Sequence, residues 1–152
     1  MILSSAEIRS RLATPADRGR LVITPFADTS LQPASYDLRA EGDLSLQPGG
    51  CTLVSSLERV ELPSDLAATL RCRSSYARRG LLLGGGFVDP GFRGQLTLCL
   101  VNMGTDAVPL VRGDRVVQMI LHEVSGGAHS YDCLLYTSPS PRDRTRSRMP
   151  SS

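Results

Sequence analysis

The stretch GGGFVDPGFRGQLTLCLVN, residues 84–102, decides the fold class of this chain. Its first half consists of turn residues, because three glycines precede Phe87 and the pair Pro90-Gly91 forces a turn directly after Asp89. Its second half, residues 95–102, is a short apolar run of the length expected for a β-strand. Turn residues that alternate with short apolar runs are typical of β-rich folds, so this stretch predicts an all-β protein.

The same alternation continues on both sides of this stretch, from about residue 21 to residue 124. Short strands at this spacing predict a sandwich, a jelly roll or a barrel. Before them, residues 4–12 predict a short helix, because Ser4 or Ser5 can cap it and Ile8 and Leu12 lie on one face. The predicted strands are residues 21–23, 36–40, 51–55, 58–62, 69–73, 95–102, 107–111 and 115–122.

The composition is that of one globular domain. The chain has 152 residues, and its 41% hydrophobic content excludes a disordered protein. All 17 basic residues are arginines and the net charge is +2, but the last twenty residues hold four arginines and one acid. The body is therefore close to neutral, so we expect neither a nucleic-acid nor a membrane partner. The sequence has no apolar run of transmembrane length and no signal-peptide pattern, so a cytoplasmic location is expected.

The four cysteines are Cys51, Cys72, Cys99 and Cys133, and no two of them form a C-x-x-C motif. Neither histidine lies near them at a metal-binding spacing. The pattern therefore favours isolated, small apolar side chains in strands over a metal or redox site.

Residues 133–152 are expected to form a disordered, non-native tail outside a domain of residues 1–132. The segment is rich in Arg and Ser and has no hydrophobic periodicity. It also resembles translated sequencing-adapter DNA, which indicates that the natural C-terminus is lost near Asp132. The alternative is a genuine basic tail that binds an anionic partner.

Two segments carry side chains suited to binding an anion. The segment LQPASYDLR, residues 31–39, places Tyr36 and Asp37 on opposite faces of a strand. The segment CRSSYARRG, residues 72–80, offers the fork of Arg73 and two hydroxyls to phosphate oxygens. A short helix that begins at Ser74 or Ser75 would add free backbone N–H groups. Taken alone, the first segment is more often a turn followed by an ordinary strand, and the second is more often a solvent-exposed loop.

Two further segments offer a base and a buried amide. In residues 84–94 the glycines allow a flat ligand to approach the backbone, and Asp89 at its corner can act as a general base. The alternative is an aspartate that caps its own turn. In GDRVVQMI, residues 113–120, Gln118 lies on an apolar strand and needs a partner. That partner is either a ligand or, more commonly, a backbone carbonyl.

In their order and spacing, these four segments resemble the successive motifs of the trimeric dUTPase and dCTP deaminase superfamily. Residues 86–94, GFVDPGFRG, match its Gly-hydrophobic-hydrophobic-Asp…aromatic-x-Gly motif position for position. The opening Met-Ile-Leu-Ser and the pair Pro25-Phe26 after Thr24 are typical of the deaminase-like branch. The resemblance covers about residues 1–132 and implies a distorted jelly roll or barrel that forms a homotrimer with sites between subunits.

The resemblance also implies a role for each site residue. Asp89 would direct a water molecule onto the α-phosphorus of dUTP, and Mg²⁺ would be held mainly by the triphosphate, without a direct protein ligand. Asp37 would be structural or would touch the water shell of the metal. The implied phosphate ligands are Arg73, Ser74, Ser75 and Gln118, and the implied nucleoside contacts are Gly85, Gly86, Phe87 and Phe92.

Two departures from the deaminases favour hydrolysis of dUTP. The glutamate that deaminases use after the aspartate motif is replaced by Cys99, which cannot shuttle protons as a carboxylate does. The His-x-Thr segment that precedes the motif in deaminases is absent from residues 80–89. The sequence thus predicts a dUTP diphosphatase, closest to the deaminase-like dUTPases of archaea. The alternatives are a dCTP deaminase that uses another acid, a nucleotide-binding relative that has lost catalysis, and a jelly-roll module with another ligand.

The family's C-terminal segment closes over the nucleotide, and we expect no counterpart of it after residue 132. Because lid closure excludes water and fixes geometry, the resemblance then implies binding with slow turnover.

Overall fold

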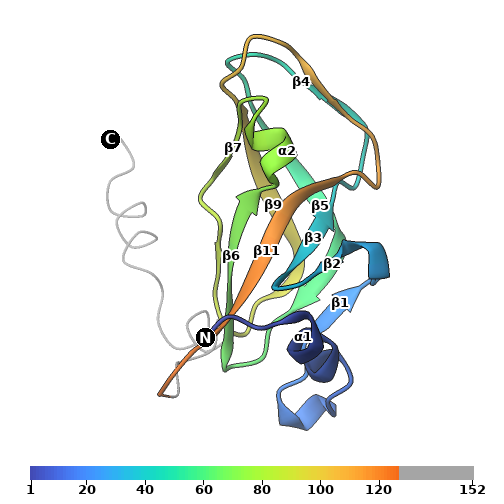
Figure 1. The fold of residues 1–152 in the computed structure, drawn as a ribbon, viewed down its shortest axis with the longest axis vertical. Coiled ribbons are helices and arrows are strands. Elements are labelled where there is room, and N and C mark those ends of the chain that lie inside the picture. Colours follow the sequence, from blue (N-terminus) through green and yellow to red (C-terminus); the bar gives the residue numbers. More distant parts are fainter. Residues whose placement is uncertain (127–152) are drawn as a thin grey trace, which may run out of the picture.

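The computed structural model describes residues 1–126, which fold as two facing β-sheets with a two-stranded arm (Figure 1). One sheet has the strand order β1-β5-β9-β7 and the other has the order β2-β3-β11-β6-β8, while β10 and β4 pair separately in the arm. The strands are β1 (Val22–Thr24), β2 (Leu31–Gln32), β3 (Ser35–Arg39), β4 (Leu44–Leu46), β5 (Cys51–Glu61), β6 (Leu66–Cys72), β7 (Leu81–Gly84), β8 (Phe87–Val88), β9 (Arg93–Asn102), β10 (Val108–Leu110) and β11 (Arg115–Glu123). The helices are α1 (Ser5–Leu12) and α2 (Ser74–Ala77), with 3-10 turns η1 (Ala16–Arg18) and η2 (Asp28–Ser30).

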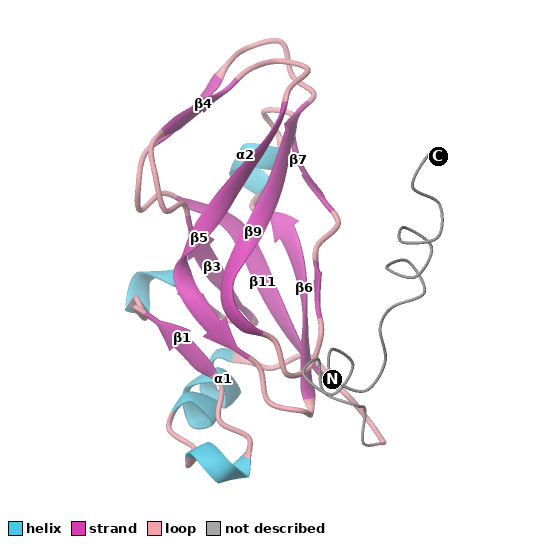
Figure 2. Cartoon of the chain, turned by 180° about the vertical axis from the view of Figure 1, so that it is seen from behind, coloured by secondary structure: helices cyan, strands magenta, loops and turns pink. Residues whose placement is uncertain are grey.

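The first sheet is built around the antiparallel pair β5 and β9, which lie side by side in Figure 2. Alternate residues of β9, Leu96, Leu98 and Leu100, are buried, whereas Thr97 and Cys99 between them face outward. This period of two is what a strand requires when only one of its faces packs on a core.

The second sheet has β11 at its centre, antiparallel to β3 on one side and to β6 on the other. The register places Gln118 of β11 opposite Asp37 of β3 and opposite Arg71 of β6. Three polar residues that are far apart in the sequence therefore form one row across this sheet, and this row positions the candidate site.

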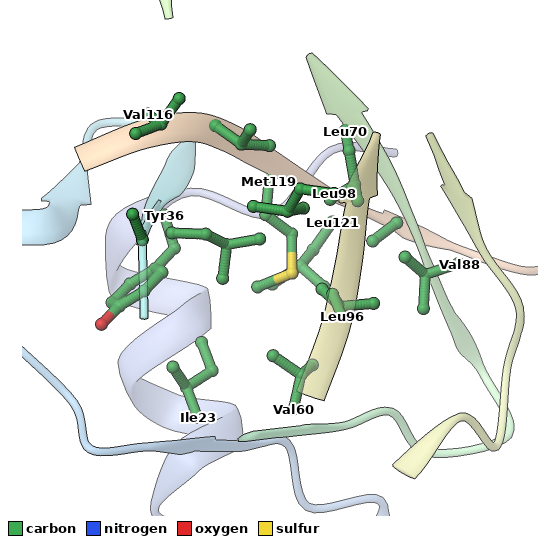
Figure 3. Close-up of a cluster of buried hydrophobic side chains, with 14 of the residues drawn as sticks. Ile23, Tyr36, Val60, Leu70, Val88, Leu96, Leu98, Val116, Met119 and Leu121 are labelled. Atoms are coloured by element: carbon green, nitrogen blue, oxygen red, sulfur yellow. The ribbon is translucent and has the colours of Figure 1, made fainter. Parts of the chain in front are cut away.

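The core lies between the two sheets and draws side chains from both (Figure 3). Val60 and Leu98 come from the first sheet, and Met119 and Leu121 from the second; all four are buried. Helix α1 covers the end of the core with Ile8, which is fully buried, and Ser4 caps the helix by accepting a 3.2 Å hydrogen bond from the backbone N–H of Glu7. Removing water from these side chains supplies most of the stabilisation.

The structure confirms an all-β fold with a short N-terminal helix, but the sheets do not close into a barrel. The prediction of two strands at residues 51–55 and 58–62 is wrong, because β5 runs without a break from Cys51 to Glu61. The pairing of β5 with β9 is irregular between Ser55 and Arg59, and here Ser56 donates to the carbonyl of Glu58 at 2.7 Å and the Glu58 carboxylate accepts from the Arg39 backbone N–H at 2.9 Å. The strands β2, β4, β7 and β8 were not predicted.

The expected domain boundary at residue 132 and the tail after it lie outside the described residues. Within residues 1–126, no helix is both long enough and apolar enough to span a membrane.

Candidate functional site

A cleft of about 530 Å³ opens where β3, β6 and β11 meet the start of α2. Four of the predicted site residues line it: Asp37, Arg73, Ser74 and Gln118. The cleft also takes in Arg71 and Ser35, which the sequence did not single out. A somewhat larger hollow of about 580 Å³ lies between α1 and β1, but it is lined mainly by apolar residues and contains none of the predicted site residues.

Asp37 anchors two arginines beside the cleft. Its side chain is only 2% exposed, and its Oδ2 atom lies 3.1 Å from Arg73 Nε and 3.6 Å from Arg115 Nη1. Arg73 Nη1 also donates to the carbonyl of Arg115 at 3.3 Å, and Arg115 Nη1 donates to the carbonyl of Thr29 at 2.6 Å. These contacts hold the guanidinium of Arg73 at the cleft, where its remaining N–H groups can meet an anion.

The carboxylate of Asp37 is nevertheless incompletely satisfied. Among the described residues no group donates a hydrogen bond of good geometry to Oδ2, despite its contacts with two cations. Burial raises the pKa of Asp37, and the nearby Arg73 and Arg115, which favour the charged form, offset this effect only in part. Whether Asp37 is structural or touches the water shell of a metal stays a prediction; its Oδ2 faces the two arginines.

The other polar groups of the cleft come from neighbouring strands. Gln118 Nε2 donates to the hydroxyl of Ser35 at 3.0 Å, so its partner among the described residues is a side-chain hydroxyl and not the backbone carbonyl that the sequence suggested. Helix α2 begins at Ser74, as predicted, with Arg73 at its N-cap. Ser75 follows on this short helix but does not line the cleft. The cleft thus presents cations and hydroxyls, which suits an anionic ligand.

Asp89 lies outside this cleft, on the loop between β8 and β9. The loop is held by backbone hydrogen bonds, with Gly91 N donating to Leu62 O at 3.0 Å and Leu62 N donating to Phe92 O at 2.9 Å. The side chain of Asp89 itself is exposed and makes no hydrogen bond or ion pair with the described residues. It therefore does not cap its own turn, and a fixed backbone presents a free carboxylate to solvent.

The predicted nucleoside contacts lie on the same loop region as Asp89. Gly85 and Gly86 both have positive φ angles, of +78° and +109°. A side chain on Gly86 would come within 2.7 Å of the carbonyl oxygen of Leu70, whereas the space around Gly85 is open. The close approach that Gly86 permits is therefore to β6, and only Gly85 leaves room for a ligand at the backbone.

The two aromatic rings of this region differ in their surroundings. Phe87 is 65% exposed, which is unusual for a phenylalanine in a folded domain. Phe92 is half-buried and packs against the hydrophobic core. Neither ring lines the cleft at Arg73.

The structure therefore divides the predicted site residues into two groups. The cleft group provides a cation and hydroxyl and amide groups, and its members are Asp37, Arg73, Ser74 and Gln118. The loop group provides an exposed carboxylate, an exposed ring and an open glycine, and its members are Gly85, Gly86, Phe87, Asp89 and Phe92. Sequence analysis missed the cleft residues Arg71 and Ser35 and the anchoring Arg115. The registers of β6 and β3 with β11 bring Arg71 and Ser35 to the cleft, and these registers were not visible in the sequence.

The prediction of isolated cysteines is wrong for two of them. Cys51 and Cys99 lie on the paired strands β5 and β9, and their sulfur atoms are 3.0 Å apart. Cys72 agrees with the prediction, as it is half-buried against the core. Cys133 lies outside the described residues. Within residues 1–126, no three His, Cys, Asp or Glu side chains group closely enough to hold a metal ion.

Comparison with known proteins gives one consistent family. A family model described as dCTP deaminase-like matches residues 40–124. A dCTP deaminase of Thermococcus kodakarensis is 38% identical over 126 residues, covering 73% of this chain and 81% of the relative. A "dCTP deaminase, dUMP-forming" of Streptomyces coelicolor is 34% identical over 173 aligned residues, covering 91% of this chain and 88% of the relative.

Solved structures share the fold. The 2'-deoxycytidine 5'-triphosphate deaminase of Agrobacterium tumefaciens superposes with a TM-score of 0.68 at 20% identity, covering 88% of this chain and 52% of the other. The EIAV dUTPase gives a TM-score of 0.61 at 21% identity, covering 72% of this chain and 93% of the other. At these identities the similarity is one of architecture.

Proposed function

Since this chain belongs to the dCTP deaminase-like family, we propose that it is a nucleotide hydrolase that splits dUTP into dUMP and pyrophosphate. The observation that carries the choice of reaction is Cys99, which stands where deaminases of this superfamily have a glutamate. Its side chain contacts the sulfur of Cys51, 3.0 Å away. A thiol in this position has no carboxylate chemistry with which to pass protons between an attacking water and a leaving amine.

Asp89 acts as the general base in this proposal. Its carboxylate is exposed and has no partner among the described residues, so it is free to accept a proton from water. The backbone bonds of Gly91 and Phe92 to Leu62 fix the turn that carries it. A base held in this way directs the water towards the α-phosphorus instead of moving with a flexible loop.

The cleft receives the phosphates. Arg73 supplies the fork that binds phosphate oxygens, with Ser74 and Gln118 as neutral donors in the cleft and Ser75 next to them on α2. Asp37 fixes Arg73 through the 3.1 Å contact to Nε and is thereby a positioning residue. Arg71 at the rim adds a second positive charge to the cleft.

The loop group recognises the nucleoside. Backbone groups at Gly85 and Phe87 read the uracil edge, Gly86 holds the loop against β6 by accepting a 2.6 Å hydrogen bond from Leu70 N–H, and Phe92 packs on the deoxyribose. Mg²⁺ accompanies the triphosphate, and because residues 1–126 contain no cluster of metal-ligating side chains, no step is assigned to a protein-bound metal.

The active site is shared between two copies of the chain, in a homotrimer. One observation supports this: Asp89 does not line the cleft that contains Arg73. A neighbouring copy that brings its loop to this cleft would complete both halves of the site.

Parallel assays with dUTP and dCTP test the reaction. We expect pyrophosphate release from dUTP and no ammonia from dCTP. The names of the relatives in Thermococcus kodakarensis and Streptomyces coelicolor favour dCTP deamination as the second candidate. Ammonia released from dCTP at a rate equal to or above that of pyrophosphate would establish the second candidate and refute the first.

The variant Asp89→Asn tests the base. Because this side chain makes no contact with the described residues, the variant should fold as the wild type does and lose pyrophosphate release by a factor of about 10²–10⁴. Asp17→Asn, another exposed acid on η1, is the matched control and should keep full activity. Activity retained in Asp89→Asn would show that another group takes the proton.

Mixing two inactive variants tests the shared site. Asp89→Asn and Arg73→Gln should each be inactive alone. If they are unfolded together and refolded, a chain with an intact Asp89 can meet a neighbour with an intact Arg73, and about a quarter of the sites should recover. A mixture that stays inactive, although both variants assemble as the wild type does, would place Arg73 and Asp89 of one chain in one site.

A further inference from the structure

A pair of thiols lies on the outward face of the β1-β5-β9-β7 sheet. In the β5–β9 ladder, Cys51 is opposite Val101 and Cys99 is opposite Leu53, so the two cysteines occupy diagonal positions on one face. Their Sγ atoms are 3.0 Å apart. Cys51 is exposed and Cys99 is half-buried, so small molecules in solution can reach the pair through Cys51.

The geometry is close to that of a disulfide. Sulfur atoms in a disulfide are about 2.05 Å apart, so each needs to move only by about half an ångström. Diagonal positions in an antiparallel sheet have Cα atoms roughly 7–8 Å apart, slightly beyond the range of about 4.4–6.8 Å that disulfides usually span, so closing the bond requires a small backbone movement. The required adjustment is available at Cys51, because it is the first residue of β5 and directly follows the turn at Gly49-Gly50.

The pair adjoins the start of the Gly84–Phe87 loop. Cys99 is the register partner of Gly84 on β7, and a Cβ atom on Gly84 would lie 3.3 Å from the Cys99 sulfur. Because β9 lies between β5 and β7, a bond to Cys51 draws this sulfur away from Gly84. Oxidation therefore changes the packing under the loop that, on the proposed function, contacts the nucleoside.

We propose that Cys51 and Cys99 form a reversible redox site that closes to a disulfide. The exposed Cys51 thiolate attacks a low-molecular-weight disulfide such as oxidised glutathione and releases one thiol. Cys99 then displaces the second thiol, so that two S–H bonds are lost, one S–S bond forms, and two electrons and two protons pass to the oxidant. Protein disulfides that do form in reducing compartments are usually transient or redox-sensing, in keeping with a bond near the geometric limit.

Peptide mapping of the full chain after treatment with oxidised glutathione tests the proposal. Trypsin cleaves after arginine, which places Cys51 in residues 40–59, Cys99 in residues 94–112, Cys72 in residues 72–73 and Cys133 in residues 116–142. After free thiols are alkylated, we expect a crosslinked peptide of residues 40–59 with residues 94–112 that disappears on addition of dithiothreitol. This readout is independent of whether the chain hydrolyses dUTP.

Three serine variants give the experiment its controls. Cys99→Ser should lose the crosslink and accumulate a glutathione adduct on Cys51, since the second thiol is missing. Cys51→Ser should lose the crosslink and give little adduct. Cys72→Ser should behave as the wild type, because burial raises the pKa of Cys72 to about 11 and keeps it unreactive. A wild-type chain that accumulates the Cys51 adduct without the crosslink, or that crosslinks through another cysteine, would overturn the proposal.

Discussion

Replacing Asp37 by asparagine should separate the stability of the fold from the geometry of the cleft. Burial raises the pKa of Asp37 above its unfolded value near 3.8, against the opposing effect of Arg73 and Arg115. A carboxyl group whose pKa is raised by folding disfavours the folded state once it ionises. Stability is therefore lost as the pH rises from about 4 through the raised pKa, and the loss persists at neutral pH.

Asparagine keeps the shape of the side chain and removes its charge. The arginines that lose their counter-charge have side chains that are 29% and 35% exposed, so water can solvate them in the variant. At pH 7 we therefore expect Asp37→Asn to be as stable as the wild type or more stable, by on the order of 1 kcal/mol. At pH 3, where the wild-type Asp37 is itself protonated, the difference in unfolding free energy should disappear.

The effect on turnover should have the opposite sign. Without Asp37, the guanidinium of Arg73 loses the 3.1 Å contact that orients it in the cleft. A hydrogen bond from Arg73 to a phosphate oxygen involves charged groups and contributes about 1.5–3 kcal/mol, so losing its alignment should lower kcat/KM for dUTP roughly 10- to 150-fold.

The assay combines urea unfolding at pH 3 and pH 7 with pyrophosphate release. Asp17→Asn again serves as the control for removing one exposed negative charge. An Asp37→Asn variant that is destabilised by more than about 2 kcal/mol at pH 7, or whose kcat/KM equals that of the wild type, would refute the positioning role of Asp37.

Three further substitutions test how the scaffold is held. Glu58→Ala should cost about 3–5 kcal/mol in urea unfolding, because its buried carboxylate accepts hydrogen bonds of 2.9 and 2.7 Å from Arg39, and a loss under 1 kcal/mol would contradict this. Gly86→Ala should cost about 1–3 kcal/mol through its φ of +109° and the 2.7 Å approach to β6, with a thermal shift as the measurement. Arg11 lowers the pKa of Asp65, so Asp65→Asn should reduce stability at pH 7 but not at acidic pH below the lowered pKa; an equal deficit at every pH would refute this.

The strands were predictable wherever apolar residues alternate one by one with polar or small residues along the sequence. In β9 the alternation of Leu96, Leu98 and Leu100 with polar or small residues indicates one buried face. In β5 the same period is present, but Ser56 and Glu58 occupy buried positions and hide it. Their hydrogen-bond partners lie on β9 and β3, so only the tertiary structure explains how two polar residues fit a buried face.

The site was predictable in its parts but not in its arrangement. The order and spacing of four segments that resemble family motifs predicted Arg73, Asp89 and Gln118 as site residues, although each segment alone was weak. It could not show that Asp89 lies outside the cleft, or that Cys51 and Cys99 meet. Both facts depend on strand register between segments far apart in the chain, and a one-residue slip in register reverses which face a side chain occupies.

Two buried acids, Glu58 and Asp37, differ in their hydrogen bonds, and this difference distinguishes a residue that supports the fold from one that supports the site. Glu58 is fully buried, and its carboxylate oxygens accept hydrogen bonds from Arg39 and Tyr36. Asp37 is as deeply buried, yet its Oδ2 has charge contacts without a hydrogen bond from the described residues. A buried polar group that makes all its hydrogen bonds stabilises the fold. A buried carboxylate with an oxygen that accepts no hydrogen bond needs another reason to be there. For Asp37 we propose that this reason is the orientation of Arg73 at the cleft, because the 3.1 Å contact fixes a cation beside Ser74 and Gln118, where an anion such as a phosphate can bind.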